Sequence, residues 1–197
     1  MKDKSRKHHH LFVVCLIIAF CISGVFIACD NQSDTNDQLD INDSDSRESL
    51  SGITLGTSQE RVIEILGRDY AAEEYADDAG YLKEDAYQWT YENRIDLLIG
   101  RDSHTVIQVR AFSDDIQTAL GVKVGDNATE AFSLYRKHYD EVISRHDNVK
   151  LNGWFDVGND MVLIFDTNKD DNKIVNDEIL PESKIEAVYL KYQSSID

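Results

Sequence analysis

The chain's best candidate for site chemistry is a stretch rich in oxygen side chains, residues 166–177. Asp166, Asn168 and Asp170 occupy its positions one, three and five, and Asp177 occupies position twelve. Carboxylate and amide oxygens at this spacing suit a hard cation such as calcium. The pattern departs from a calcium loop because aspartate stands where the sharp turn needs glycine, and because position twelve is not glutamate. A polar hairpin loop explains the same residues, so both interpretations stay open.

Residue sets typical of an enzyme are missing. His104, His138 and His146 are scattered, without a cysteine or carboxylate at metal-ligand spacing. No phosphate-binding glycine loop, nucleophile elbow or zinc motif occurs. The pair Glu73 and Glu74 would suit a two-carboxylate hydrolase, but 37 Asp and Glu residues make such pairs expected by chance. We therefore expect a protein that is not an enzyme and has no cofactor, with calcium as its one candidate ligand.

A second set of candidate residues is aromatic and would bind a protein partner. Trp89 and Tyr91 alternate with Tyr87 on one predicted strand, and Trp154 and Tyr189 lie on two later strands. Trp and Tyr dominate the energetics of protein interfaces. The same alternation is typical of a strand packed against helices. Partner binding and core packing both stay open, and core packing is favoured for most of these residues.

The amino-terminal residues 1–28 are predicted to be an export signal. Basic residues precede an apolar run from Leu11 to Ala28, and Cys29 follows directly. This arrangement resembles the lipobox of bacterial lipoproteins, which implies acylation of Cys29 and a lipid anchor in the bacterial cell membrane. The alternative is an uncleaved membrane anchor that ends at Cys29. Basic residues on the amino-terminal side predict an extracytoplasmic location in either case.

Residues 29–51 are predicted to form a disordered acidic tether. Asp, Asn, Ser and Gln dominate this stretch, and Leu39 and Ile41 are its rare apolar residues. Such a composition cannot bury enough apolar surface to offset chain entropy. The whole chain carries a formal net charge of -17. A field of this sign disfavours nucleic acid and anionic lipid, so proteins or cations are the expected partners.

Residues 52–119 and 120–197 are predicted to be two tandem repeats. The pattern glycine, apolar, polar, apolar, glycine occurs at residues 52–56 and again at 121–125. Each copy continues with capping residues and an amphipathic stretch, and then with runs typical of strands. The acidic stretch 68–86 is expected to be a loop. We expect an α+β fold in which each repeat is a capped helix, or helix-loop-helix, followed by about three antiparallel strands.

The glycine pattern, the capped helix and the strand motif Trp89-Thr90-Tyr91 together resemble the repeat of SmpA/OmlA-type envelope lipoproteins. They are also similar to the tandem repeat of the beta-lactamase inhibitory protein. The resemblance implies a small antiparallel sheet that grips a protein partner. We therefore expect a lipid-anchored module that binds an envelope or extracellular protein. The alternative is a cation- or ligand-responsive envelope sensor that uses residues 166–177.

Overall fold

The computed structural model describes residues 48–197, apart from 172, 177 and 197. The predicted signal, most of the predicted tether and the lipidation residue Cys29 lie outside the described residues. No helix in the described part of the chain is long and apolar enough to cross a membrane.

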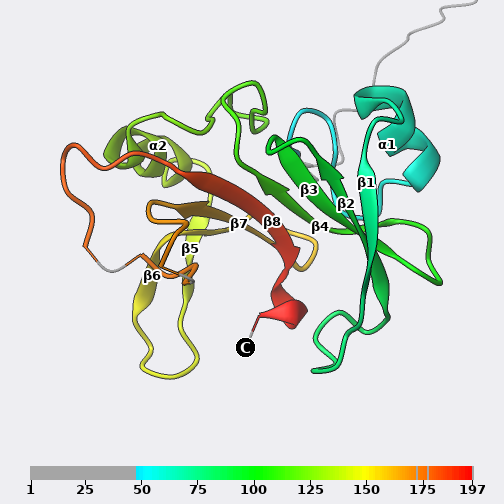
Figure 1. The fold of residues 1–197 in the computed structure, drawn as a ribbon. Helices are drawn as coiled ribbons and strands as arrows, with labels where there is room; N and C mark the ends of the chain where they lie inside the picture. Colours follow the sequence, from blue (N-terminus) through cyan, green and yellow to red (C-terminus); the bar gives the residue numbers. More distant parts are fainter. Residues whose placement is uncertain (1–47, 172, 177, 197) are drawn as a thin grey trace, which may run out of the picture. The chain divides into compact units, whose positions relative to one another are not determined.

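Eight antiparallel strands form one sheet, with neighbours in the order β1-β2-β3-β4-β8-β7-β6-β5 (Figure 1). Each pair of neighbours is antiparallel, and β4 pairs with β8 where the two four-stranded halves meet. The strands are β1 (Ala71–Tyr75), β2 (Ala86–Tyr91), β3 (Ile95–Gly100), β4 (Val106–Ala111), β5 (Asp140–Ile143), β6 (Lys150–Asp156), β7 (Met161–Asp166) and β8 (Ala187–Tyr192).

Two short helices begin at side-chain caps. In α1 (Gln59–Leu66) the Arg61 N–H donates to the Ser58 hydroxyl at 3.3 Å. In α2 (Ala128–Tyr135) the Glu130 N–H donates to the Asn127 side chain at 3.0 Å. These hydrogen bonds satisfy backbone N–H groups in the first turn, which have no acceptor within the helix. A 3-10 turn, η1 (Gln193–Ser195), follows β8.

The predicted α+β fold of two tandem helix-plus-strand repeats is wrong, because the described chain is mainly β. The helices have only eight residues each, and all strands belong to a single sheet. Two of the strands were not predicted from the sequence, and the reason is physical. Strand β1 is an exposed edge strand with the sequence AAEEY, and β5 is a four-residue edge strand that begins with two acids. Neither carries the apolar alternation that a half-buried strand shows.

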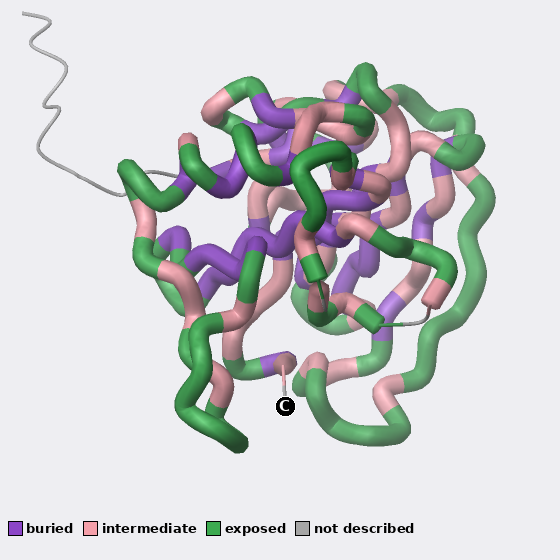
Figure 2. The backbone as a smooth tube through the Cα atoms, turned by 90° about the vertical axis from the view of Figure 1, so that its left-hand side faces the viewer, coloured by how far each residue is buried: buried purple, intermediate pink, exposed green. Residues whose placement is uncertain are grey.

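The core lies on one face of the sheet, which we call the helix face because α1 and α2 cover it (Figure 1). Val62 of α1 and Phe132 and Tyr135 of α2 are buried there. The Tyr135 ring meets the Phe165 ring of β7 edge-on, with centroids 4.8 Å apart. Buried backbone runs along the strands in Figure 2, while the hairpin ends are exposed. We call the opposite face of the sheet the open face.

Residues 48–51, which we expected to end the disordered tether, are part of the fold. The Glu48 carboxylate is fully buried and accepts hydrogen bonds from the Tyr135 hydroxyl at 2.9 Å and from the Ala119 N–H at 2.7 Å. Leu50 is also fully buried and bridges to Ile53 and Thr118. The folded region therefore starts no later than Glu48. Composition did not show this, because buried hydrogen bonds compensate the charge of Glu48.

Candidate functional site

The open face is built from two rows of side chains that run across the sheet, because paired residues on neighbouring strands project to the same side. The first row comprises Gln88, Leu98, Gln108, Lys191 and Val162. The second row comprises Thr90, Asp96, Arg110, Tyr189, Ile164 and Trp154.

Arg110 lies at the centre of the second row. Its guanidinium carbon lies 4.3 Å from the centroid of the Phe112 ring and 5.1 Å from that of the Tyr189 ring. Cation–π contacts of this kind hold a guanidinium in one orientation. Asp96 is its partner in the strand register, and both residues line a polar pocket on this face. The Nε of Arg110 is buried, and no described atom accepts a hydrogen bond from it.

Lys191 lies in the first row, between Gln108 of β4 and Val162 of β7. Its side chain is partly buried, and burial alone lowers the pKa of its ammonium group. No carboxylate among the described residues pairs with it, whereas Lys169 at the surface pairs with Asp170 at 2.8 Å. Lys191 is thus a partly buried cation with no counter-charge among the described residues.

Asp166 lies at the end of β7, next to Tyr189. Its carboxylate accepts from the Asn168 N–H at 2.8 Å and from the Tyr189 hydroxyl at 3.5 Å. Burial raises the pKa of this carboxyl above its ordinary value, and Asp171 adds to the rise. Backbone bonding to Asn168 and the charge of Arg110 act in the opposite direction.

An apolar pocket of about 140 Å³ lies beside this face. The indole of Trp154 forms one wall and donates to the Ile174 carbonyl at 2.8 Å. Ile143 and Val175, both also in the wall, are 51% and 42% exposed. Sites for drug-sized ligands span roughly 300–1,000 Å³, so this pocket suits a single side chain. Its walls are formed by Val142, Ile143, Ser144, Arg145, His146, Leu151, Trp154, Val175, Gln193 and Ile196.

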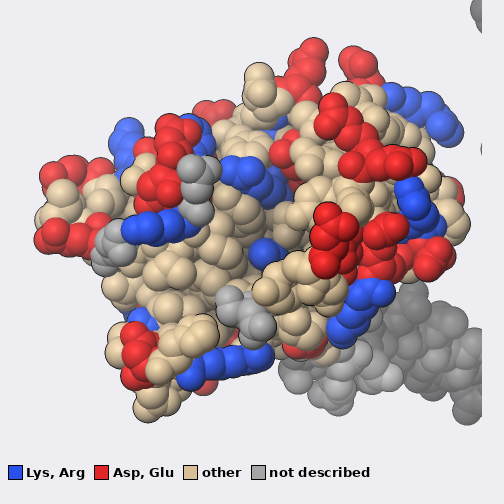
Figure 3. Space-filling model, turned by 60° about the horizontal axis from the view of Figure 1, so that its bottom comes forward, with Lys and Arg blue, Asp and Glu red and all other residues tan. Residues whose placement is uncertain are grey.

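Figure 3 views the molecule from the side opposite the helices. A broad area of uncharged atoms occupies this side, with a few basic side chains inside it and acidic side chains around it on both sides. The open face is therefore less acidic than expected from the net charge of the whole chain, which is -17.

The four aromatic residues predicted to bind a partner are all buried, and they divide between the two faces. Trp89 and Tyr91 belong to the helix-face core, where Tyr70 stacks on Trp89 at 4.0 Å and the Tyr91 hydroxyl donates to the Gly67 carbonyl at 3.0 Å. Trp154 and Tyr189 belong to a cluster under the open face. The rings of Trp154 and Tyr189 lie beneath the open face and contribute little exposed surface to it.

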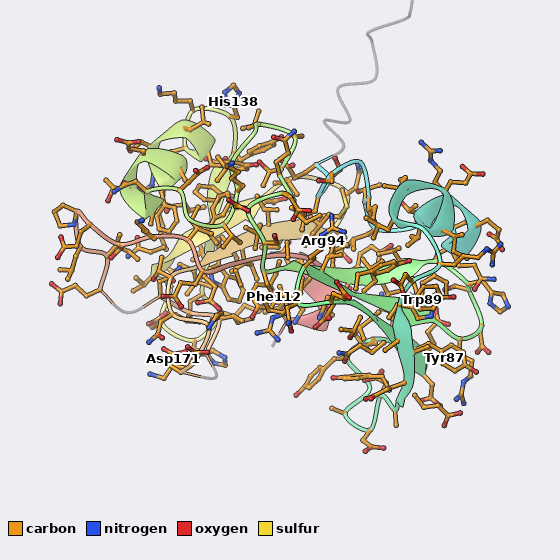
Figure 4. All side chains as sticks on the ribbon, turned by 45° about the horizontal axis from the view of Figure 1, so that its top comes forward. Tyr87, Trp89, Arg94, Phe112, His138 and Asp171 are labelled. Carbon is orange, nitrogen blue, oxygen red and sulfur yellow. The ribbon has the colours of Figure 1, made fainter. Side chains whose placement is uncertain are left out.

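The predicted cation ligands do not converge. Asp166 is 2% exposed and bonded within the fold, while Asp170 is exposed and pairs with Lys169. Asp177 lies outside the described residues. Within the described part of the chain, no group of three or more His, Cys, Asp or Glu residues has an arrangement that could hold a metal ion. In Figure 4, Asp171 of this loop and Trp89 of β2 lie at opposite ends of the sheet.

The two basic residues of the open face were not singled out from the sequence, although a signal was present. Each is the one basic residue of a largely apolar strand, Arg110 in VIQVRA and Lys191 in AVYLKY. Period-two alternation places both opposite the apolar core positions of their strands.

Comparison of the chain with protein-family models, with curated proteins and with solved structures finds no match. The resemblance to SmpA/OmlA-type lipoproteins therefore stays a prediction.

Proposed function

We propose that this protein is a non-enzymatic binding module that contacts another protein through the open face of its sheet. The observation that carries the proposal is the make-up of that face. A stacked arginine, a lysine with no counter-charge among the described residues and an apolar pocket lie on the side of the sheet that neither α1 nor α2 covers.

The composition of this face supports a protein as the ligand. Arg and aromatic residues are enriched in interfaces, and acidic residues are depleted at their centres. Arg110, Phe112 and Tyr189 form such a centre, with the pocket beside Trp154. This pocket gives small-molecule binding less support, because its volume of about 140 Å³ is below the range typical of ligand sites.

The proposed module acts outside the cytoplasm on a lipid anchor. The support for this part is the sequence alone, namely the basic segment, the apolar run and Cys29 directly after Ala28. Acyl chains on Cys29 would hold the module at the membrane, since each buried CH₂ contributes about 0.8 kcal/mol.

Site-specific photo-crosslinking of the full chain in its native membrane tests the binding proposal. A photoreactive residue at Gln108 reports on the open face, and one at the exposed Gln117 outside the sheet is the matched control. We expect one defined protein to be cross-linked from position 108 and not from 117. The same products from both positions, or none from position 108, would contradict the proposal.

A further inference from the structure

We infer that the pocket beside Trp154 receives one apolar side chain of the protein partner, while an acidic residue close to it in the partner's sequence contacts the β5–β6 turn, residues 144–150, at the pocket's rim. This inference rests on the proposed function and deepens it, because it specifies the chemistry of the segment that the partner presents.

The walls of the pocket are held in place by the fold. Trp154 is only 3% exposed, and its indole donates to the Ile174 carbonyl at 2.8 Å. Val142, Leu151 and Ile196 line the pocket and also pack against the buried cluster that contains Trp154. A ligand therefore does not have to order these walls, and ordering is one of the main costs of binding.

Exposed apolar side chains gather at the mouth of the pocket. Ile143 and Val175 belong to its wall and are 51% and 42% exposed, and Val149 of the adjoining turn is 55% exposed. In the described part of the chain the other large exposed apolar or aromatic residues are Tyr75, Tyr81 and Leu180. Such a concentration of apolar surface beside a pocket marks an interaction site. An incoming apolar side chain would remove it from water, which drives association.

The rim of the pocket is basic. Arg145 and His146 lie in its wall, and Lys150 is the register partner of Ile143. The only acid of the turn is Asp147, which accepts a hydrogen bond from the backbone of the same turn at 3.3 Å. Without the histidine, the turn carries two positive formal charges against one negative charge.

This local charge determines what accompanies the apolar side chain. The whole chain has 37 acidic and 20 basic residues, so a basic turn is an exception on its surface. Interfaces place opposite charges against each other, and an acidic segment therefore complements this rim.

The spacing of the two features sets the spacing in the partner. Directly paired residues such as Ile143 and Lys150 have Cβ atoms about 4.5–5.5 Å apart. An extended chain advances about 3.3–3.6 Å per residue. An acid one or two positions from the apolar residue therefore reaches the turn while the apolar side chain occupies the pocket.

A peptide-display selection on the full chain in detergent tests this inference, with an unbiased peptide library as the probe. Affinities of the selected peptides are then measured for the parent protein and for variants. Ile143→Gln removes exposed apolar surface at the pocket, and Leu180→Gln does so at a residue outside the pocket that is 44% exposed. Lys150→Gln removes a charge at the rim, and Lys137→Gln removes one at an exposed position just after α2.

We expect the selected peptides to share an aliphatic or phenyl residue with Asp or Glu one or two positions away. Ile143→Gln, or alanine at the apolar position of the peptide, should reduce affinity by at least about tenfold, as for the loss of a buried anchor. Lys150→Gln, or the amide in place of the peptide's acid, should reduce it about threefold at low salt. Leu180→Gln and Lys137→Gln should leave affinity unchanged.

Two further measurements separate this contact from other causes. Combining Lys150→Gln with the amide peptide should cost no more than either change alone, because both remove the same interaction. Thermal unfolding of Ile143→Gln and Lys150→Gln should occur at the parent temperature, since both residues are exposed.

Peptides that bind Ile143→Gln as tightly as the parent, or that lose nothing on the amide exchange, would overturn the inference. So would a selection that yields no binder. The photo-crosslink from position 108 decides separately on the proposed function. A defined cross-linked protein together with any of these results would mean that the open face binds its partner through other contacts.

Discussion

At the residue scale, the basic side chains of the open face differ from several others in the groups that surround them. Elsewhere several arginines pair with acids, as Arg136 does with Glu141 at 2.7 Å and Arg101 with Glu74 at 3.2 Å. On the open face, aromatic rings surround Arg110, and only burial shifts the pKa of Lys191. Neither cation has an ion pair with a carboxylate among the described residues.

Asp166 gives a prediction about pH at this scale. Its folded-state pKa lies above the ordinary 3.8, so the folded chain holds this proton more tightly than the unfolded chain. Its contribution to stability is therefore fully present below pH 3.8 and is lost as the pH rises through the folded-state pKa. Asp166→Asn keeps an acceptor for the Asn168 N–H and removes the charge. We expect its melting temperature at pH 7 to exceed that of the parent by about 2–4 °C, as for a gain of about 1 kcal/mol.

Thermal denaturation at pH 7 and at pH 3.5 measures this difference, which should shrink toward zero at the lower pH. Asp170→Asn, at an exposed position of the same loop, controls for the loss of one surface charge. A lower melting temperature for Asp166→Asn at pH 7 would contradict this prediction, because it would mean that the carboxylate stabilises the fold.

At the scale of elements, close approach of backbone and aromatic rings fixes where α2 sits on the sheet. Gly153 of β6 has a φ of +82°, and a Cβ there would lie 2.6 Å from the Phe132 ring and 2.9 Å from the Phe165 carbonyl. Glycine therefore lets α2 pack directly over β6. Gly158, in the following turn, has a φ of +83° and open space around it.

These two glycines form a matched pair for mutation. Gly153→Ala should lower the free energy of unfolding by about 1 kcal/mol for the left-handed backbone and by a further 1–3 kcal/mol or so for the overlap. Gly158→Ala should show only the first effect. Urea denaturation measures both, and equal losses in the two variants would rule out the close contact with Phe132.

The segment that begins at Glu48 is a second link between elements. Its carboxylate joins α2, through Tyr135, to the loop at Ala119. Glu48→Ala would leave the buried Tyr135 hydroxyl and the Ala119 N–H without this acceptor. Each orphaned group costs about 1–3 kcal/mol, so we expect a loss of at least about 2 kcal/mol in urea denaturation. Glu182→Ala, at an exposed loop position, should be near neutral; a similar loss in both would contradict this role.

At the scale of the whole molecule, charge and attachment act together. The chain carries a net charge of -17, and acidic side chains also gather on the exposed edge strand β1, at Glu73 and Glu74. Charges on an edge strand oppose unwanted strand pairing. The face that we propose for binding has a broad uncharged area with acidic side chains around it.

Membrane attachment is predicted to depend on Cys29. Cys29→Ser should leave the protein without acyl chains, since the lipobox modification begins at the thiol and serine has none. We expect the variant to lose incorporation of labelled palmitate completely, as measured by gel fluorography after metabolic labelling. Cys21→Ser, inside the apolar run, is the matched control and should label like the parent. Undiminished labelling of Cys29→Ser would reject lipidation at this residue.

Local sequence predicted much of the individual strands. The runs around Trp89, Leu97, Val109 and Leu163 alternate or are continuously apolar, and all lie in strands. The edge strands β1 and β5 could not be predicted in this way, because an exposed strand gains its stability from pairing and not from burial. The role of Glu48 could not be predicted from local sequence either, because its hydrogen-bond partners lie about 70 and 87 residues further along the chain.

The sequence by itself determined the acidic character of the chain, its predicted export signal and the apolar alternation of its central strands, since these depend on composition and on neighbouring residues. Only the tertiary structure decided that all strands join one sheet, through the pairing of β4 with β8. That pairing also decided the candidate site, because it brings Arg110 beside Tyr189 from positions 79 residues apart. A local pattern shows which face of its own strand a side chain occupies. It does not show which strand lies alongside, and the neighbouring strand determines which residues meet at the site.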